Sequence, residues 1–147
     1  MSKIRVGVAG YGTIGQRLAD GVAMQEDMEL VGIADLAPTL SLRALRERDM
    51  IGANGVQYNL YLVDGADKAA FDAKGIPVAG SFDELCQKVD IMLDSAPGGV
   101  GAKNKEHYYD KYGVKAIFQG GEKNSVADVF FHGYANYEKG VGQNYLK

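Results

Sequence analysis

Three glycines near the amino terminus have the spacing of a phosphate-binding loop. Gly10, Gly12 and Gly15 form a G-x-G-x-x-G pattern, which is a weak signal alone because six-residue matches occur by chance. Here the pattern directly follows an apolar run at 4–9 that is typical of a buried strand, and it opens a run with helical spacing. In that context Gly10 permits a tight turn, Gly12 lets a pyrophosphate approach the backbone, and Gly15 lets the helix pack closely on its strand. The helix N-terminus would then present free N–H groups to the phosphates of a dinucleotide.

An acidic residue follows at the distance expected for a ribose contact. Asp35 ends a second apolar run, 28–34, and lies 20 residues beyond Gly15. A carboxylate at this position can accept hydrogen bonds from the adenosine ribose hydroxyls. The alternative interpretation is a turn or helix-capping aspartate ahead of Pro38. We favour the ribose contact, which makes NAD the preferred cofactor, while arginines on the next helix keep NADP possible.

Two further glycine-containing loops, 94–99 and 119–123, each follow an apolar run. The carboxyl ends of parallel strands share one edge of the sheet, where ligands of open α/β folds bind. Ordinary turn chemistry explains the glycines about as well, but the shared edge favours contact with the cofactor. The residues expected to make it are Ala96 and Pro97 in the first loop and Gly120 and Gly121 in the second.

The elements that must position these loops alternate along the chain. Strands are expected at 4–9, 28–34, 58–62, 89–95 and 114–119, with a short extended piece at 77–78. Helices are expected at 13–24, 41–49, 64–74, 82–88 and 102–111, the fourth capped by Ser81 with Glu84 in a capping box. This alternation predicts one α/β domain over 1–147, a Rossmann-type doubly wound, mostly parallel sheet with helices on both faces. The aromatic-rich segment 126–147 is interpreted as core or interface packing.

The composition limits the possible functions. Hydrophobic residues make up 46% of the 147 residues, charged residues 24%, and the net charge is −3 with no basic run. We therefore expect neither a nucleic-acid partner nor a membrane surface, and the apolar runs are too short for a membrane span. The single cysteine, Cys86, excludes an internal disulfide and suits a reducing compartment, so the cytoplasm is expected.

No catalytic or metal-binding constellation is recognisable. His107 lies in a polar helical stretch and His132 among aromatic residues, and neither has metal-ligand spacing to cysteine or acidic partners. Cys86 follows Leu85 on a predicted helix and is interpreted as a small buried apolar residue rather than a nucleophile. The sequence thus predicts a binding site for a cofactor but no catalytic group.

Several stretches together resemble the archaeal-type (type II) phosphorylating glyceraldehyde-3-phosphate dehydrogenases. They are Val8–Arg17, Gly75–Gly80, Asp94–Pro97 with Val100–Asn104, Tyr134–Tyr137 and Gly142–Tyr145, and the most specific is Gly113–Lys123. The resemblance covers essentially the whole chain.

The resemblance implies that cofactor binding and catalysis lie in different parts of the enzyme. In that family the chain continues into a strand ending in Ser-Cys-Asn-Thr-Thr-Gly. Its cysteine attacks the aldehyde, hydride passes to the nicotinamide, and phosphate releases 1,3-bisphosphoglycerate. This sequence stops at Lys147, so it is expected to be the NAD(P)-binding part, inactive alone, whether an isolated piece or half of a split enzyme. The resemblance also implies cofactor contacts at Thr13, Ile14 and Gly120 or Gly121, and either a homo-oligomer or a separate catalytic chain as partner.

The chain departs from the family after the second strand. The family commonly has a Thr/Lys-rich stretch there, compatible with a 2′-phosphate, whereas this chain has Ala34–Pro38. Two other interpretations stay open. One is another Rossmann oxidoreductase, such as homoserine dehydrogenase or dihydrodipicolinate reductase, although Gln119–Lys123 speaks against both. The other is a free-standing dinucleotide-binding module without chemistry of its own.

Overall fold

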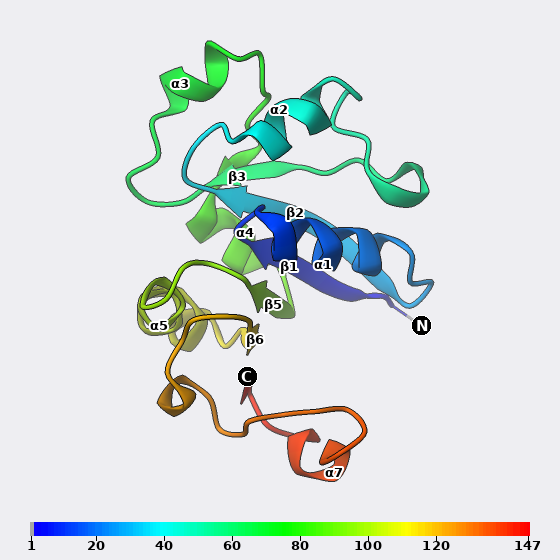
Figure 1. Ribbon diagram of the computed structural model, residues 1–147, viewed down its shortest axis with the longest axis vertical. Helices are drawn as coiled ribbons and strands as arrows, with labels where there is room; N and C mark the ends of the chain where they lie inside the picture. Colours follow the sequence, from blue (N-terminus) through cyan, green and yellow to red (C-terminus); the bar gives the residue numbers. More distant parts are fainter. Residues whose placement is uncertain (1) are drawn as a thin grey trace.

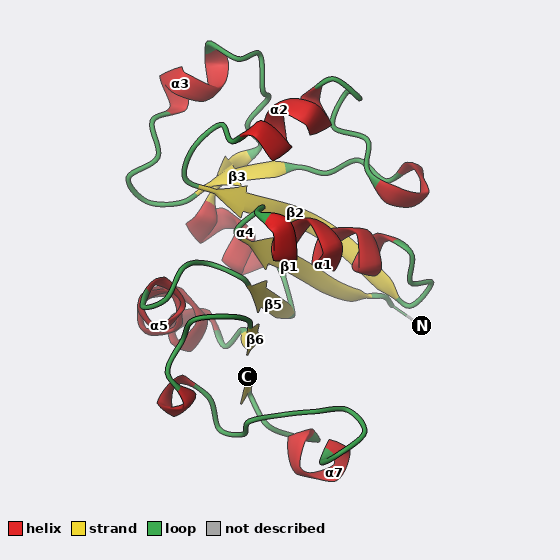
Figure 2. Ribbon diagram, viewed as in Figure 1, coloured by secondary structure: helices red, strands yellow, loops and turns green. Residues whose placement is uncertain are grey.

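A single parallel sheet forms the centre of the molecule (Figures 1 and 2). In the computed structural model, which describes residues 2–147, seven strands lie in the order β4-β3-β2-β1-β5-β6-β7, and every neighbouring pair is parallel. Their bounds are β1 Ile4–Ala9, β2 Met28–Asp35, β3 Leu60–Leu62, β4 Gly80–Ser81, β5 Ile91–Asp94, β6 Lys115–Phe118 and β7 Tyr145–Leu146. The Rossmann-type fold is therefore confirmed, with a sheet that is parallel throughout. Its strand order reverses between β1 and β5.

Helices cover both faces of the sheet, as predicted. In Figure 1, α1 lies in front of the strands and α4 behind them. The bounds are α1 Thr13–Ala23, α2 Leu40–Arg46, α3 Lys68–Asp72, α4 Phe82–Lys88, α5 Val100–Asn104, α6 Asp110–Tyr112 and α7 Tyr137–Gly140, with 3₁₀ turns at Ala53–Gly55 and Asn124–Val126. Within residues 2–147, no helix has the length and apolar character that crossing a membrane would require.

Two hydrophobic cores lie on opposite faces of the sheet, and β1 contributes to both. Val6 and Val8 pack into the core beneath α1, whereas Ala9 belongs to the core beneath α4. Gly7 shares that second face, where a Cβ would come within 2.9 Å of the Met92 side chain. The period-two alternation of β1 thus explains why small residues separate its valines.

Two of the predicted helices are shorter than the sequence pattern indicated. The helix expected at 64–74 begins only at Lys68, because Gly65 turns the chain at φ +84° and Asp67 caps the helix, accepting from the Ala69 N–H at 3.0 Å. The helix expected at 41–49 ends at Arg46, since residues 49 and 50 adopt positive φ.

Tyr58, expected in a strand, instead anchors the Gly52–Gly55 stretch that looked unusual in the sequence. Its ring is fully buried, and its hydroxyl donates to Asp20 at 2.6 Å and accepts from the Ala53 N–H at 3.1 Å. Gly52 lies against this ring so closely that a Cβ would come within 2.1 Å of it. The glycine is therefore required by packing rather than by a ligand. Burial raises the pKa of Tyr58 above its ordinary value, so the phenol stays a donor.

A π-helical segment, Lys105–Tyr109, joins α5 to α6 in the helix that was expected at 102–111. Because a π-turn takes more residues than an α-turn, Asn104 and Tyr109 come onto one side of the helix, and both contact Asp94. The sequence pattern gave no sign of this irregularity.

The segment after β6 extends away from the other helices and returns to the sheet as β7 (Figure 1). β7 pairs with β6 at two positions, and the Phe131 N–H donates to the Lys147 carbonyl oxygen at 2.7 Å. Phe131 packs over Gly140 and beside Tyr137. Phe130 and Tyr134 are exposed, so core packing is confirmed for only part of these aromatic residues, and packing at an interface stays a prediction.

Candidate dinucleotide-binding site

The glycine loop connects β1 to α1 at the carboxyl edge of the sheet. Gly10 adopts φ +86°, which a residue with a side chain rarely does. A Cβ on Gly15 would lie 1.8 Å from the Gly10 carbonyl oxygen. A Cβ on Gly12 would meet no atom within 4 Å, because this backbone faces open space. The three glycines thus have the geometry that their assigned roles require.

The N-terminus of α1 is open to an anion. Its N-cap residue is Gly12, no side chain caps it, and its first turn carries no acid. Thr13 and Ile14 are exposed. The first N–H groups of the helix and its dipole therefore point at solvent beside the glycine loop, which is the arrangement that binds phosphates.

Asp35 ends β2 as predicted, and its carboxylate holds the glycine loop. It accepts from the Tyr11 N–H at 3.0 Å and from the Leu36 N–H at 2.7 Å. It does not cap α2, since that cap is Thr39, whose hydroxyl accepts from the Leu42 N–H. Each carboxylate oxygen can still accept a second hydrogen bond, so a ribose hydroxyl can be bound without releasing the loop.

Ser95 joins the glycine loop to the loop after β5, at the point where the strand order reverses. Its hydroxyl lies 2.9 Å from the carbonyl oxygens of both Ala9 and Gly10. The predicted residues Ala96 and Pro97 follow directly, Ala96 buried and Pro97 exposed. Ligands of open α/β folds bind at such a switch point.

A buried carboxylate supports this loop from below. Asp94 is 1% exposed and accepts from the Ala96 N–H at 3.0 Å, the Asn104 amide at 2.9 Å and the Tyr109 hydroxyl at 2.6 Å. Burial raises the pKa of Asp94, while the three hydrogen bonds oppose that rise. Asp94 thus fixes the loop and the helix after it in one arrangement.

A cavity of about 490 Å³ opens between Asp35 and the helix after β5. Its apolar wall includes Leu36, Val63, Pro97 and Val100, while Asp35, Asp64, Lys103 and His107 supply charged or polar groups. This mixture of a broad apolar surface with a few polar groups is typical of small-molecule sites.

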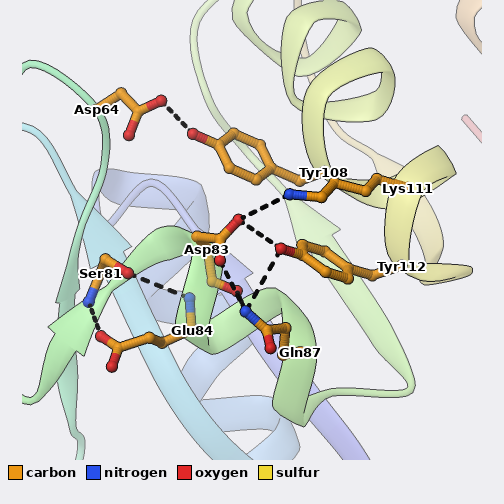
Figure 3. A network of polar contacts seen from close by, with 8 residues as sticks. All are labelled: Asp64, Ser81, Asp83, Glu84, Gln87, Tyr108, Lys111 and Tyr112. Carbon is orange, nitrogen blue, oxygen red and sulfur yellow. Dashed lines mark hydrogen bonds and ion pairs between the residues drawn. The ribbon is translucent and has the colours of Figure 1, made fainter.

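The helix after β5 contacts both Asp64, in the loop after β3, and the helix α4, as Figure 3 shows. Tyr108 points toward Asp64, to which its hydroxyl donates. Asp83 of α4 accepts from the Tyr112 hydroxyl at 2.7 Å and lies 3.6 Å from the Lys111 ammonium. The predicted capping box of Ser81 and Glu84 is confirmed. The hydrogen bond from Tyr112 lowers the pKa of Asp83.

The loop after β6 lies against the loop after β5. Gly120 adopts φ +77°, and a Cβ on Gly98 would come within 3.0 Å of the Gly121 carbonyl oxygen. Glu122, only 8% exposed, accepts from the Gly101 N–H of α5 at 2.8 Å. The predicted loops containing Ala96–Pro97 and Gly120–Gly121 are therefore adjacent at one edge.

Residues 2–147 contain no cluster of three or more His, Cys, Asp or Glu side chains that could hold a metal ion. His107 lines the cavity, which the sequence did not indicate. His132 is exposed and accepts from the Tyr134 N–H at 3.2 Å.

Cys86 is expected to be unreactive while the protein is folded. Its thiol is 1% exposed in the core beneath α4, and burial raises its pKa to about 12. Because the thiolate is the reactive form, its reaction with an aromatic disulfide reagent at pH 8 should be at least about a hundredfold slower than in denaturant. Absorbance of the released thiol measures both rates. Equal rates would contradict the buried, nonnucleophilic assignment.

Besides His107, sequence reasoning missed other residues that shape the site: Asp64, Asp94, Tyr108 and Glu122. Asp94 offered one signal, because a carboxylate that ends a strongly apolar strand is unusual unless it is paired. Tyr108 and Asp64 carried no such signal, since they meet only through the tertiary fold.

The sheet order, the glycine loop and the open helix N-terminus define a Rossmann-type dinucleotide-binding fold. No family model matches the chain. The predicted resemblance is nevertheless confirmed by similar sequences. A glyceraldehyde-3-phosphate dehydrogenase of Archaeoglobus fulgidus is 43% identical over 147 residues, which are 100% of this chain and 41% of that protein. The enzyme of the same name from Pyrococcus abyssi is 45% identical over 99% of this chain and 41% of its own length. The chain thus spans about two fifths of these relatives.

Solved structures show the same fold at low sequence identity. The myo-inositol 2-dehydrogenase of Lactobacillus plantarum matches with a TM-score of 0.52 and 14% identity, over 86% of this chain and 31% of that one. GenD2 from gentamicin A biosynthesis, solved in complex with NAD, matches with a TM-score of 0.50 and 12% identity, over 80% of this chain and 27% of its own.

Proposed function

We propose that this chain is the NAD-binding part of a phosphorylating glyceraldehyde-3-phosphate dehydrogenase. The observation that carries the proposal is the open glycine loop at the switch point, beside a cavity bordered by Asp35. Relatives with this enzyme's name match the chain along its whole length. The complete enzyme would convert glyceraldehyde-3-phosphate, inorganic phosphate and NAD to 1,3-bisphosphoglycerate and NADH. We place it in the cytoplasm, as a homo-oligomer or with a separate catalytic chain.

The residues present suit each part of the dinucleotide. The pyrophosphate would lie on Gly12 and the α1 N-terminus, and the adenosine in the cavity with its ribose at Asp35. The second nucleoside would lie over β5 and β6, because each half of a Rossmann sheet binds one mononucleotide. The bound nicotinamide supplies a hydride acceptor.

The protein contributes binding and orientation. Thr13 and Ile14 would donate backbone hydrogen bonds, Ala96 and Pro97 would border the adenosine, and Gly120 or Gly121 would border the nicotinamide side. Cys86 is buried in the α4 core, so the thiol that attacks the aldehyde would have to come from elsewhere in the enzyme.

Replacing Gly12 by valine tests the proposed site. The substituted carbons would occupy the open space in front of the loop, where the pyrophosphate belongs, while the backbone at φ −81° accepts any residue. We expect NAD binding to weaken at least about a hundredfold, or about 2.7 kcal/mol, with an unchanged thermal midpoint. Calorimetric titration with NAD measures the affinity. An unaltered affinity would show that this loop is not the site.

Asp35 is expected to favour NAD over NADP. Its carboxylate would accept from a ribose hydroxyl of NAD but meet the 2′-phosphate of NADP, and at about 4–5 Å such a repulsion costs roughly 3–4 kcal/mol before screening. Of the three arginines that could offset it, Arg43, Arg46 and Arg48, the first two line a separate cavity, and Arg46 donates to the Gly75 carbonyl oxygen at 3.2 Å.

Dissociation constants of both cofactors, for the unmodified chain and Asp35→Ala, measure the preference. We expect NAD to bind at least about tenfold more tightly than NADP, and the ratio to fall in the variant. Tighter binding of NADP by the unmodified chain would overturn the assignment, as would an unchanged ratio. Leu36→Ala is the matched control, because it alters the same cavity wall without changing charge.

A further inference from the structure

The N-terminus of α5 differs from that of α1 because a carboxylate from another loop occupies it. The N-cap residue of α5 is Gly99, which has no side chain to cap the helix. Glu122, which follows β6, supplies that acceptor by bonding the Gly101 N–H at 2.8 Å. The loop after β6 therefore caps the helix after β5, and Figure 1 shows this loop passing close to α5.

The contact is closely packed as well as charged. A Cβ on Gly101 would come within 3.0 Å of both the Glu122 carboxylate and the Phe118 ring. On the other side of Glu122, the backbone of Gly121 meets that of Gly98. Burying a carboxylate is costly unless it is paired, and this one is paired with a backbone donor at a positive helix end. The hydrogen bond and the close packing around Glu122 together fix the distance between the loop after β5 and the loop after β6.

The two loops serve different halves of the proposed ligand. The loop after β5 borders the cavity next to Asp35, whereas Gly120 and Gly121 lie one strand farther from it, over the second half of the sheet. A shift of the second loop would thus disturb the nicotinamide nucleoside and leave the adenosine site intact.

We propose that Glu122 is a positioning residue that holds the Gly120–Gly121 turn in place for the nicotinamide half of the dinucleotide, acting through its bond to the Gly101 N–H. This inference rests on the proposed NAD site and adds to it a residue that need not touch the cofactor. It predicts that loss of Glu122 separates the binding of the two halves.

The test compares NAD with ADP-ribose, which has the adenosine, the pyrophosphate and the second ribose and lacks only the nicotinamide ring. Both are titrated calorimetrically into the full 147-residue chain and its variants. For Glu122→Ala we expect NAD to bind about tenfold more weakly, which is about 1.4 kcal/mol, and ADP-ribose within about twofold of the unmodified chain. Glu122→Gln keeps an oxygen that can accept from Gly101 and should restore most of the NAD affinity. Glu138→Ala, an exposed glutamate on α7, is the matched control.

Gly98→Ala provides a second variant that leaves Glu122 intact and remains informative if Glu122→Ala does not fold. Its Cβ would press on the Gly121 carbonyl oxygen, so the same selective loss of NAD affinity is expected. Equal losses of affinity for NAD and ADP-ribose would mean that Glu122 only stabilises the fold, and this result would overturn the inference. Unchanged affinities for both ligands would overturn it as well. If the unmodified chain binds neither ligand, the proposed function fails, and the inference fails with it.

Discussion

Gly15→Ala is expected to destabilise the protein and to abolish NAD binding together. The new methyl carbon would lie 1.8 Å from the Gly10 carbonyl oxygen and 3.0 Å from the Ser95 hydroxyl. Both neighbours belong to the turn that joins β1 to α1, so α1 must move away from the sheet. Overpacking typically costs about 1–3 kcal/mol, and we expect the upper end because the neighbour is backbone. A loss of about 3 kcal/mol corresponds to a fall in the thermal midpoint of about 6–12 °C for a chain of this size.

The comparison with Gly12→Val makes this result diagnostic. Both substitutions alter the same loop, but a Cβ at Gly15 meets protein atoms within 4 Å, whereas a Cβ at Gly12 meets none. Differential scanning calorimetry should therefore show a lowered midpoint for Gly15→Ala alone, while titration shows lost NAD binding in both. A Gly15→Ala protein with the midpoint of the unmodified chain would mean that α1 does not pack closely against the Gly10 turn.

Asp94→Ala is expected to be the most destabilising change at the sheet edge away from the glycines. Three donors lose their acceptor: the Ala96 N–H, the Asn104 amide and the Tyr109 hydroxyl. Each buried donor left without an acceptor costs about 1–3 kcal/mol. The total of at least about 3 kcal/mol is a large part of the stability of a typical domain. Denaturant unfolding followed by circular dichroism measures it.

Asp94→Asn is the matched variant and also reports the titration of the carboxyl group. Burial raises the pKa of Asp94 in the folded protein, so the folded state binds its proton more tightly than the unfolded state does. The stability from this group is present at low pH and is lost as pH rises from the ordinary value of 3.8 through the raised one. The unfolding free energy of the unmodified chain relative to Asp94→Asn should therefore decrease across that range. A difference that increases instead would mean that the hydrogen bonds outweigh burial.

The sequence was sufficient for the fold because its local signals agree with the tertiary structure. The strand β1, the helix α1 and the loop between them all have the predicted type, since apolar periodicity and glycine placement both come from packing against the same sheet. The position of Asp35 at the carboxyl end of β2 could be predicted because the apolar run ends there, while its contact with a ribose stays a prediction. The capping box at Ser81 was found because it is a local motif.

The rest depended on contacts between distant parts of the chain. Glu122 bonds a residue 21 positions away, and Tyr108 bonds one 44 positions away. The π-helical segment forms where Asn104 and Tyr109 both contact Asp94. No local sequence pattern predicts this tertiary contact. Tyr58 resembled a strand residue because it precedes β3, but its ring fills the core against Gly52.

The central position of β1 has a consequence for how the molecule is assembled. β1 precedes β2 and β5 in the chain, and one of its edges pairs with β2 within the next 26 residues. The other edge of β1 stays unpaired until β5 has been synthesised. The hydrogen bond from the Ser95 hydroxyl to the Ala9 carbonyl oxygen, next to this edge, joins residues 86 positions apart. Until β5 has paired, a nascent chain carries an apolar strand with an unpaired edge, which invites association with other chains. Contacts this distant in sequence also slow folding. The glycine loop is thus synthesised before β5, and the site to which it belongs is complete only after β5 has paired with β1.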